Sequence, residues 1–240
     1  MALLEIRNLT KRFGGLLAND NITFDVSEGE ITGVIGPNGA GKTTLFNCIT
    51  GVYRPNGGSI LFKGERISGL RPYEICKYGI ARTFQLIQVF SDMTCLENVM
   101  VGTFLKTPNL DQAKRQALEF LQRLNLLEKK DLLAGNLTLA DRKKLEVARA
   151  LATDPRLLLL DEVAAGLNTS EVLEFIEVVR GINRAGITII MIEHVMEAVM
   201  NIAGRIVVLD GGKKITEGSP QQVASDPQVI EAYLGEGYRA

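Results

Sequence analysis

The stretch Gly36-Pro37-Asn38-Gly39-Ala40-Gly41-Lys42-Thr43-Thr44 decides the fold. It fits the pattern GxxxxGK followed by Ser or Thr, it follows a predicted strand over 30–35, and it precedes a predicted helix over 44–49. Glycines let the backbone curl so that its N–H groups point at phosphate oxygens, and the helix N-terminus adds a partial positive charge. A glycine-rich turn before a helix is the alternative, but the Lys-Thr pair in this context favours a phosphate-binding loop.

Two side chains of this loop have defined expected roles. Lys42 should bridge the β- and γ-phosphates of a nucleotide, and the hydroxyl of Thr43 should hold Mg²⁺. The sequence therefore predicts that the loop binds a chain of phosphates together with its cation.

A pair of adjacent acids ends a second apolar run. Four leucines over 157–160 are followed directly by Asp161 and Glu162. Because ligands of α/β sheets bind beyond the carboxyl ends of the strands, Asp161 is placed to reach Mg²⁺, and Glu162 to orient or deprotonate the attacking water. A solvated turn with acids at a helix start is the alternative when this pair is considered alone.

The single histidine, His194, follows a third apolar run over 187–192. A lone histidine is commonly a surface residue or one whose polar atoms are satisfied in the core. At the end of a buried strand in a phosphate-binding fold, however, His194 is expected to sense the γ-phosphate.

Short apolar or β-branched runs alternate with helical patterns along the chain. Strands are predicted over 22–26, 31–35, 59–63, 157–160, 187–192, 206–209 and 213–216. Runs that are apolar throughout imply strands buried on both faces, and hence a parallel sheet covered by helices. From about 93 to 153 we find only helical patterns, with the apolar repeat Ala113, Ala117, Leu121, Leu124 and Leu127. These patterns predict an α/β core with an inserted helical subdomain.

Composition narrows the class of protein. The 240 residues include 27 Lys plus Arg and 28 Asp plus Glu, so the net charge is -1. The chain therefore lacks the excess of basic residues that is typical of nucleic-acid-binding proteins. Three scattered cysteines, Cys48, Cys76 and Cys95, form no disulfide framework and fit a reducing compartment. No apolar run approaches the roughly 18 residues of a membrane span, and the N-terminus does not resemble a signal peptide. We therefore expect a protein on the cytoplasmic side.

Three stretches in this order and spacing, GPNGAGKTT at 36–44, LLLLDE at 157–162 and IEH at 192–194, resemble the ATP-binding cassette (ABC) ATPases. The resemblance covers the whole chain. It implies a P-loop NTPase core of the α/β class, with a mixed or parallel β-sheet flanked by helices, an antiparallel β part and an inserted α-helical subdomain. It implies one ABC ATPase domain over 1–240, in which 1–92 and 154–240 form the nucleotide-binding core and about 93–153 the helical subdomain.

The same resemblance implies hydrolysis of ATP with Mg²⁺, in a head-to-tail dimer that holds ATP between its subunits. Phe13 matches the aromatic residue that stacks on adenine, with a core aromatic as the alternative. Gln85 matches the glutamine that contacts Mg²⁺ and the attacking water, with an ordinary polar loop residue as the alternative. Residues 165–168 match the loop that crosses to the other subunit.

The residues that the resemblance marks as functional fall into three sets. The catalytic set is Glu162, His194, Gln85 and Lys42. The expected Mg²⁺ ligands are Thr43, Gln85 and Asp161. The nucleotide is expected to contact Phe13 and all nine residues from Gly36 to Thr44.

The segment Leu137-Thr138-Leu139-Ala140-Asp141 stands where the signature of the family normally reads LSGGQ. Thr138, Leu139 and Ala140 are expected to contact nucleotide, with the Thr138 hydroxyl replacing that of serine. Both glycines are missing, and Asp141 replaces glutamine. The segment also forms a capping box for a helix that runs to about 152, so a plain helix cap is the alternative, and the two are compatible. We expect Asp141 to bond back to the N–H of Thr138.

Local stretches narrow the resemblance further. GIARTFQ at 79–85, AAGLN at 164–168 and IEAYLGE at 230–236 are similar to the ATP-binding subunit of branched-chain amino acid importers. This similarity implies a second ABC ATPase subunit, the same or paralogous, two transmembrane permease subunits and, indirectly, a solute-binding protein, but no nucleic acid. It implies a cytoplasmic protein, peripheral on the inner face of the cell membrane. Lipopolysaccharide-exporting ATPases share some of these stretches and remain an alternative.

The apolar segment 86–101 is expected to line the groove that receives a short helix of the membrane subunit. Ordinary core packing is the alternative for Leu86, Val89, Phe90 and Met93.

Two further departures from the family pattern lie outside the catalytic set. Val163 stands where proline is usual, and Asn168 stands where aspartate is usual. We therefore expect an active ATPase. A soluble cassette acting on DNA or ribosomes and a silent nucleotide-binding regulator are the rival functions.

Overall fold

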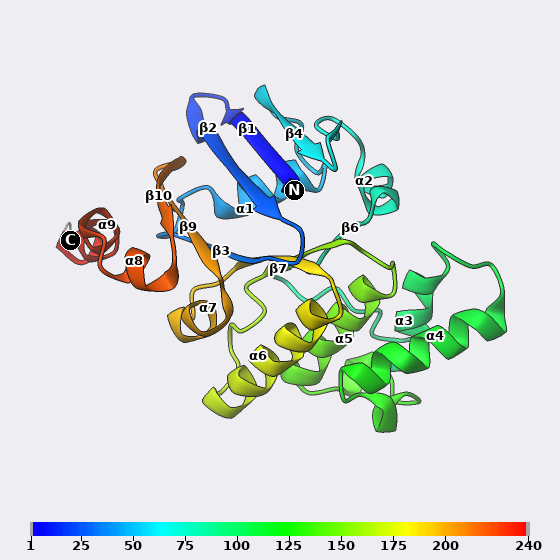
Figure 1. Ribbon diagram of the computed structural model, residues 1–240. Helices are drawn as coiled ribbons and strands as arrows, with labels where there is room; N and C mark the ends of the chain where they lie inside the picture. Colours follow the sequence, from blue (N-terminus) through cyan, green and yellow to red (C-terminus); the bar gives the residue numbers. More distant parts are fainter. Residues whose placement is uncertain (1, 239–240) are drawn as a thin grey trace.

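The computed structural model describes residues 2–238 and shows two sheets with helices packed against them (Figure 1). A four-stranded antiparallel sheet has the order β2-β1-β4-β5, and a six-stranded mixed sheet has the order β10-β9-β3-β8-β7-β6. The strands of the first are β1 (Ala2–Phe13), β2 (Leu16–Ser27), β4 (Gly57–Phe62) and β5 (Glu65–Arg66). Those of the second are β3 (Ile31–Ile35), β6 (Ile80–Arg82), β7 (Leu157–Asp161), β8 (Thr188–Ile192), β9 (Arg205–Asp210) and β10 (Lys213–Gly218).

The six-stranded sheet is the middle layer of the molecule. Its strands β6, β7, β8, β3 and β9 run parallel, and only β10 is antiparallel to its neighbour. Leu157 and Leu159 of β7 point into the core shared with the four-stranded sheet, whereas Leu158 and Leu160 point into the core under the helices. A run of four leucines is therefore explained by burial on both faces, and the expected fold class is confirmed.

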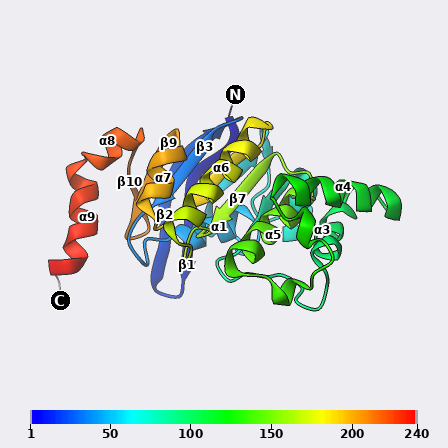
Figure 2. The ribbon, with the colours of Figure 1, turned by 90° about the horizontal axis from the view of Figure 1, so that it is seen from below.

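The helices are α1 (Lys42–Ile49), α2 (Pro72–Tyr78), α3 (Cys95–Thr103), α4 (Leu110–Arg123), α5 (Leu139–Leu151), α6 (Thr169–Arg184), α7 (Met196–Ile202), α8 (Pro220–Ala224) and α9 (Pro227–Tyr238). Two short 3₁₀ helices, η1 (Leu127–Lys129) and η2 (Ala134–Asn136), precede α5. Helices α3, α4 and α5 gather at one end of the molecule, opposite α9 (Figure 2). None of the helices within 2–238 has the length and apolar character needed to span a bilayer.

Two expectations about local structure need correction. The apolar repeat that we expected to continue through Leu124 and Leu127 breaks, because α4 ends at Arg123 and Asn125 has a positive φ of 59°. Asparagine tolerates this left-handed conformation better than most residues, so it ends the helix at a low cost in conformational free energy. The strand β1 was not anticipated from the sequence, since register shifts along its pairing with β2 break the alternation of buried and exposed residues.

Asn168 has a local role in the fold. Its side chain caps α6 by accepting from the N–H of Glu171 at 3.0 Å, and the Glu171 carboxylate accepts from the N–H of Asn168 at 2.9 Å. This reciprocal pair satisfies two N–H groups that a helix start leaves without partners. Asn168, which stands where aspartate is usual, therefore still caps the N-terminus of α6.

Candidate active site

Four loops converge at the carboxyl edges of β3, β6, β7 and β8, where they enclose a cavity of about 450 Å³. Parallel strands direct their following loops to the same edge, which is why segments so distant in sequence meet there. The predicted residues that line this cavity are Phe13, Asn38, Gly39, Ala40, Gly41, Lys42, Thr43, Thr44, Gln85, Glu162 and His194. Gly36, Pro37, Asp161 and the segment 138–140 do not line it.

The loop between β3 and α1 wraps around the ammonium of Lys42. This ammonium is buried and donates to the carbonyls of Gly36 at 2.7 Å and Pro37 at 2.9 Å. Gly41 has a φ of 98°, and a Cβ there would lie 2.3 Å from the carbonyl oxygen of Ala18. Any other residue at position 41 would therefore force the loop open.

Asp161 lies beneath the cavity floor and is 0% exposed. Its Oδ2 accepts from Arg82 at 2.6 Å, and Oδ1 is buried with no hydrogen-bond partner. Burial raises the pKa of this carboxyl, although the nearby Arg82 acts in the opposite direction. A buried carboxylate oxygen without a hydrogen-bond partner, close enough to the phosphate loop to interact with the charge of Lys42, fits an oxygen-seeking cation such as Mg²⁺.

Glu162 is held between two of the other predicted residues. Its Oε1 lies 2.8 Å from Nε2 of His194, and its Oε2 accepts from Nε2 of Gln85 at 2.9 Å. The Glu162 backbone has a positive φ of 51°, a conformation that costs a non-glycine residue free energy. The strained backbone of Glu162 thus places its carboxylate at the mouth of the cavity.

Two residues that the sequence did not flag hold the strained turn in place. Lys143 of α5 donates to the carbonyls of Glu162 at 3.2 Å and Ala165 at 2.6 Å. Glu193, which is 1% exposed, accepts from the N–H of Ala164 at 2.8 Å. A sequence signal exists only for Glu193, whose charged side chain directly follows the apolar run 187–192, whereas Lys143 lies among other charged residues. Their hydrogen bonds stabilise a turn in which Val163 stands where proline is usual.

Glu193 has an unusual acidity. Burial raises the pKa of its carboxyl to about 7, and nearby Glu162 adds to this, while the Ala164 N–H and Lys143 oppose it. A buried glutamate is therefore close to half protonated at neutral pH.

Phe13 stands at the rim of the cavity and is 41% exposed, so the alternative of a core aromatic does not hold. Its ring meets Tyr53 edge to face, with centroids 5.1 Å apart. The Lys11 ammonium lies 4.9 Å from the centre of the Phe13 ring. These contacts fix the ring at the rim, where one face can receive a planar base.

The signature segment begins α5, away from the cavity of its own chain. The Thr138 hydroxyl accepts from the N–H of Asp141 at 3.2 Å, which caps the helix. Our expectation that the Asp141 carboxylate bonds back to the N–H of Thr138 was wrong. It accepts instead from the Thr138 hydroxyl at 2.8 Å and from Lys129 at 2.6 Å. The reason is that η1 brings an ammonium within reach of the carboxylate.

The Asp141 charge is well compensated. Burial opposes its ionisation, but the hydrogen bonds from Lys129 and Thr138 outweigh burial and lower the pKa of the carboxyl. Asp141 is therefore an ionised member of a local pair rather than an isolated negative charge.

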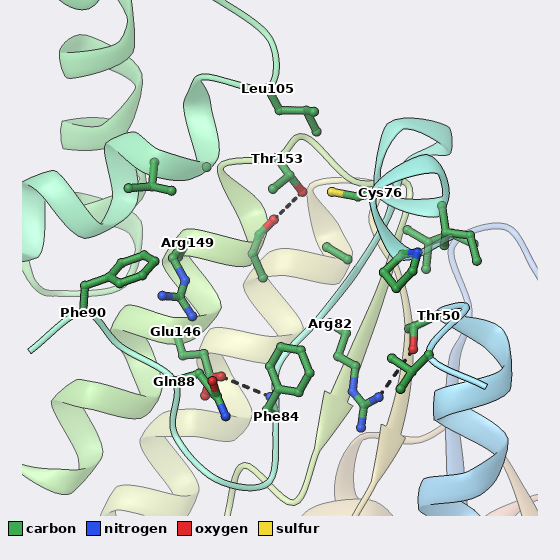
Figure 3. Close-up of a pocket in the computed structure, with 18 residues that line it drawn as sticks. Thr50, Cys76, Arg82, Phe84, Gln88, Phe90, Leu105, Glu146, Arg149 and Thr153 are labelled. Carbon is green, nitrogen blue, oxygen red and sulfur yellow. Dashed lines mark hydrogen bonds between the residues drawn. The ribbon is translucent and has the colours of Figure 1, made fainter. Parts of the chain in front are cut away.

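A second cavity, of about 510 Å³, lies between α2, α3 and α5 (Figure 3). We call it the groove. Its walls include Phe84, Gln88, Phe90, Glu146 and Arg149. Of the four residues singled out in the segment 86–101, Phe90 lines the groove, Val89 packs partly against the core, and Leu86 and Met93 do not line the groove. That the groove receives a helix of a membrane subunit stays a prediction.

The chain is similar to known proteins over nearly its whole length. The family described as "ABC transporter" matches residues 19–165, and the one described as "Branched-chain amino acid ATP-binding cassette transporter" matches residues 213–239. The high-affinity branched-chain amino acid transport ATP-binding protein LivG of Escherichia coli K12 is 44% identical, over 98% of each chain. The corresponding protein BraF of Pseudomonas aeruginosa is 42% identical, again over 98% of each chain.

Solved structures agree in fold. The ADP conformation of an ATP-binding cassette from an ABC transporter superposes with a TM-score of 0.90 and 33% identity. The match covers 98% of this chain and 99% of that one. The similarity therefore extends over the sheets, the helical segment and the cavity alike.

Proposed function

The chain belongs to the ABC transporter family of ATP-hydrolysing cassettes, and we propose that it is the subunit that powers an importer of branched-chain amino acids. One observation of the structure supports the ATP-hydrolysing role above all: the Glu162 carboxylate is held between His194 and Gln85 at the mouth of the phosphate-loop cavity. Similarity at 42% identity or more to LivG and BraF over the full length supports the substrate class.

The proposed reaction uses the chain's own residues as follows. The loop N–H groups and the Lys42 ammonium bind the β- and γ-phosphates of ATP, and Phe13 stacks on the adenine. Glu162 accepts a proton from the attacking water, which Gln85 helps to orient. His194 holds Glu162 through Nε2 before ATP binds and would redirect that single N–H to the γ-phosphate when ATP is bound.

Thr43, Gln85 and Asp161 would hold Mg²⁺. When bound, the cation neutralises phosphate charge as it builds up on the leaving group. The oxygen Oδ1 of Asp161, buried without a hydrogen-bond partner, supports this assignment.

The placement of the signature segment supports a second cassette as a partner. Thr138, Leu139 and Ala140 do not line the cavity of their own chain, and in the proposed head-to-tail dimer they face the nucleotide of a second cassette, the same or paralogous. The N-terminus of α5 presents N–H groups and a positive dipole end to that γ-phosphate. The loop over 165–168, anchored by Lys143, crosses to the same partner.

The groove is the proposed contact with the membrane. A short helix of one permease subunit lies in the groove between α2, α3 and α5, and the second permease contacts the partner cassette in the same way, which brings the chain to the inner face of the cell membrane as a peripheral protein. A solute-binding protein acts indirectly, through the permeases. In this scheme 1–92 and 154–240 form the nucleotide-binding core, and about 93–153 the helical subdomain that relays closure.

Reconstitution tests the proposed function. The chain is placed in proteoliposomes with its partner cassette, two permease subunits and a solute-binding protein of the same importer, and uptake of labelled leucine is measured. We expect uptake that requires internal ATP and that is lost in Glu162→Gln but retained in Glu177→Gln, an exposed α6 variant. ATP turnover stimulated by lipopolysaccharide, without any response to branched-chain amino acids, would instead assign the chain to export.

A further inference from the structure

Arg82, at the end of the edge strand β6, lies between the groove and the candidate cation site. Its side chain is only 7% exposed and donates to Oδ2 of Asp161 at 2.6 Å. It also donates to Oδ1 of Asn47 and lies 3.4 Å from Oγ1 of Thr50. One guanidinium therefore joins β6, β7 and the C-terminal end of α1.

Because of this contact, the two carboxylate oxygens of Asp161 have different surroundings. Oδ2 is occupied by Arg82, while Oδ1 is buried without a hydrogen-bond partner. A charge-assisted hydrogen bond at this distance fixes the rotamer of the carboxylate. Arg82 therefore determines which oxygen of Asp161 is presented to a cation.

The Arg82 side chain also lines the groove. Its guanidinium lies 4.9 Å from the centre of the Phe84 ring, and both residues line the groove (Figure 3). Phe84 is 41% exposed there, and its N–H donates to Glu146 of α5 at 3.1 Å. Whatever lies in the groove against Phe84 is thus two side chains away from Asp161.

We propose that Arg82 is a positioning residue that holds Asp161 for Mg²⁺ from the groove side, so that the groove and the cation site act on each other through one guanidinium. This inference rests on the proposed function for the cation and for the occupant of the groove. Arginine is required because its planar fork can bond Asp161 and Asn47 while stacking on Phe84, which a lysine ammonium cannot do.

The test measures the Mg²⁺ dependence of nucleotide binding, not turnover. A non-hydrolysable ATP analogue is titrated calorimetrically into the full-length protein over a series of Mg²⁺ concentrations and in EDTA. In Arg82→Gln we expect the Mg²⁺ concentration for half-maximal binding to rise by roughly 10- to 100-fold, as for other outer partners of metal ligands. Binding in EDTA should be unchanged, which a general loss of structure would not allow.

Further variants keep the test decisive. Arg82→Lys retains the charge and serves if Arg82→Gln does not fold; we expect its Mg²⁺ requirement to rise about tenfold. In an Asp161→Asn background, Arg82→Gln should add nothing, because it acts through Asp161. Phe84→Ala should raise the Mg²⁺ requirement in the same direction, and an unchanged value would refute the connection to the groove.

The matched control is Arg149→Gln. Arg149 also lines the groove and stacks on an aromatic ring, with Phe90 5.0 Å away, but it does not bond Asp161. We expect its Mg²⁺ dependence to equal that of the wild type. Equal shifts in the Arg82 and Arg149 variants, or additive effects of Arg82→Gln and Asp161→Asn, would overturn the inference. A wild-type protein that binds no analogue even in Mg²⁺ would refute the proposed function instead.

Discussion

His194 and Glu162 meet across the ends of β8 and β7, with Nε2 of the imidazole 2.8 Å from Oε1 of the carboxylate. The contact is between side chains that are 32 positions apart in sequence, and it places a proton donor beside the proposed base. Both side chains line the phosphate-loop cavity, so His194 can orient Glu162 there.

His194→Ala should therefore slow hydrolysis more than it weakens binding. We expect kcat to fall by roughly 100-fold or more, because the group that positions Glu162 and donates to the γ-phosphate is lost, while the affinity for ATP changes only a few-fold. Phosphate release at saturating ATP gives kcat, and calorimetry with a non-hydrolysable analogue gives the affinity. An equal loss in both quantities would argue that His194 only supports binding.

Lys42→Ala should weaken nucleotide binding. The ammonium that lies against the loop carbonyls is lost, and with it a charge-assisted hydrogen bond to phosphate of about 1.5–3 kcal/mol, or roughly 10- to 100-fold in Kd. Lys114→Ala, at an exposed position of α4, is the control and should bind as the wild type does. Undiminished affinity in Lys42→Ala would remove this residue from the phosphate site.

Glu193→Gln should change how stability depends on pH. Between about pH 4.5 and 7 the native protein holds a proton on Glu193 that the unfolded chain has released, since burial raises the pKa to about 7 from 4.5. The free energy of unfolding therefore decreases as pH rises through this window, by about 3 kcal/mol for this group. The glutamine keeps an acceptor for the N–H of Ala164 and removes the titration.

Urea unfolding of both proteins at several pH values between 5 and 7 checks this expectation. The decrease in the free energy of unfolding over that range should be smaller in Glu193→Gln. Parallel pH profiles would mean that Glu193 ionises normally in the folded protein.

Asp141→Asn should lower stability slightly and leave ATP-driven dimerisation nearly unchanged. The substitution removes the charge that Lys129 pairs with, a partly exposed contact of about 1 kcal/mol, or a decrease in Tm of roughly 2–4 °C. Lys129→Ala should have a similar effect, and the double variant should be no worse than either. An Asp141→Asn protein that melts no lower and dimerises at least tenfold more tightly would show that the carboxylate faces the partner's phosphate.

The sequence predicts those parts of the site that are local in the chain. The phosphate loop, the Asp161–Glu162 pair and His194 each follow one apolar run, and the parallel sheet then brings the ends of those runs together. The pattern could not show Arg82 against Asp161 or Lys143 against the carbonyl of Glu162, since these contacts join residues 79 and 19 positions apart. Asp141 illustrates the same limit: the cap was predictable, but the ammonium of Lys129 reaches the carboxylate only because of η1.

Glu162 is the proposed base for ATP hydrolysis, and the most direct test of this role is turnover and dimerisation of Glu162→Gln in Mg²⁺ and ATP. We expect phosphate release to fall to near background, because glutamine keeps the contacts of the side chain but cannot accept the proton. ATP should then remain bound and hold two cassettes together as a dimer on size exclusion, whereas the wild type returns to its starting state. Hydrolysis by Glu162→Gln at the wild-type rate would contradict the assignment of the base and the mechanism built on it.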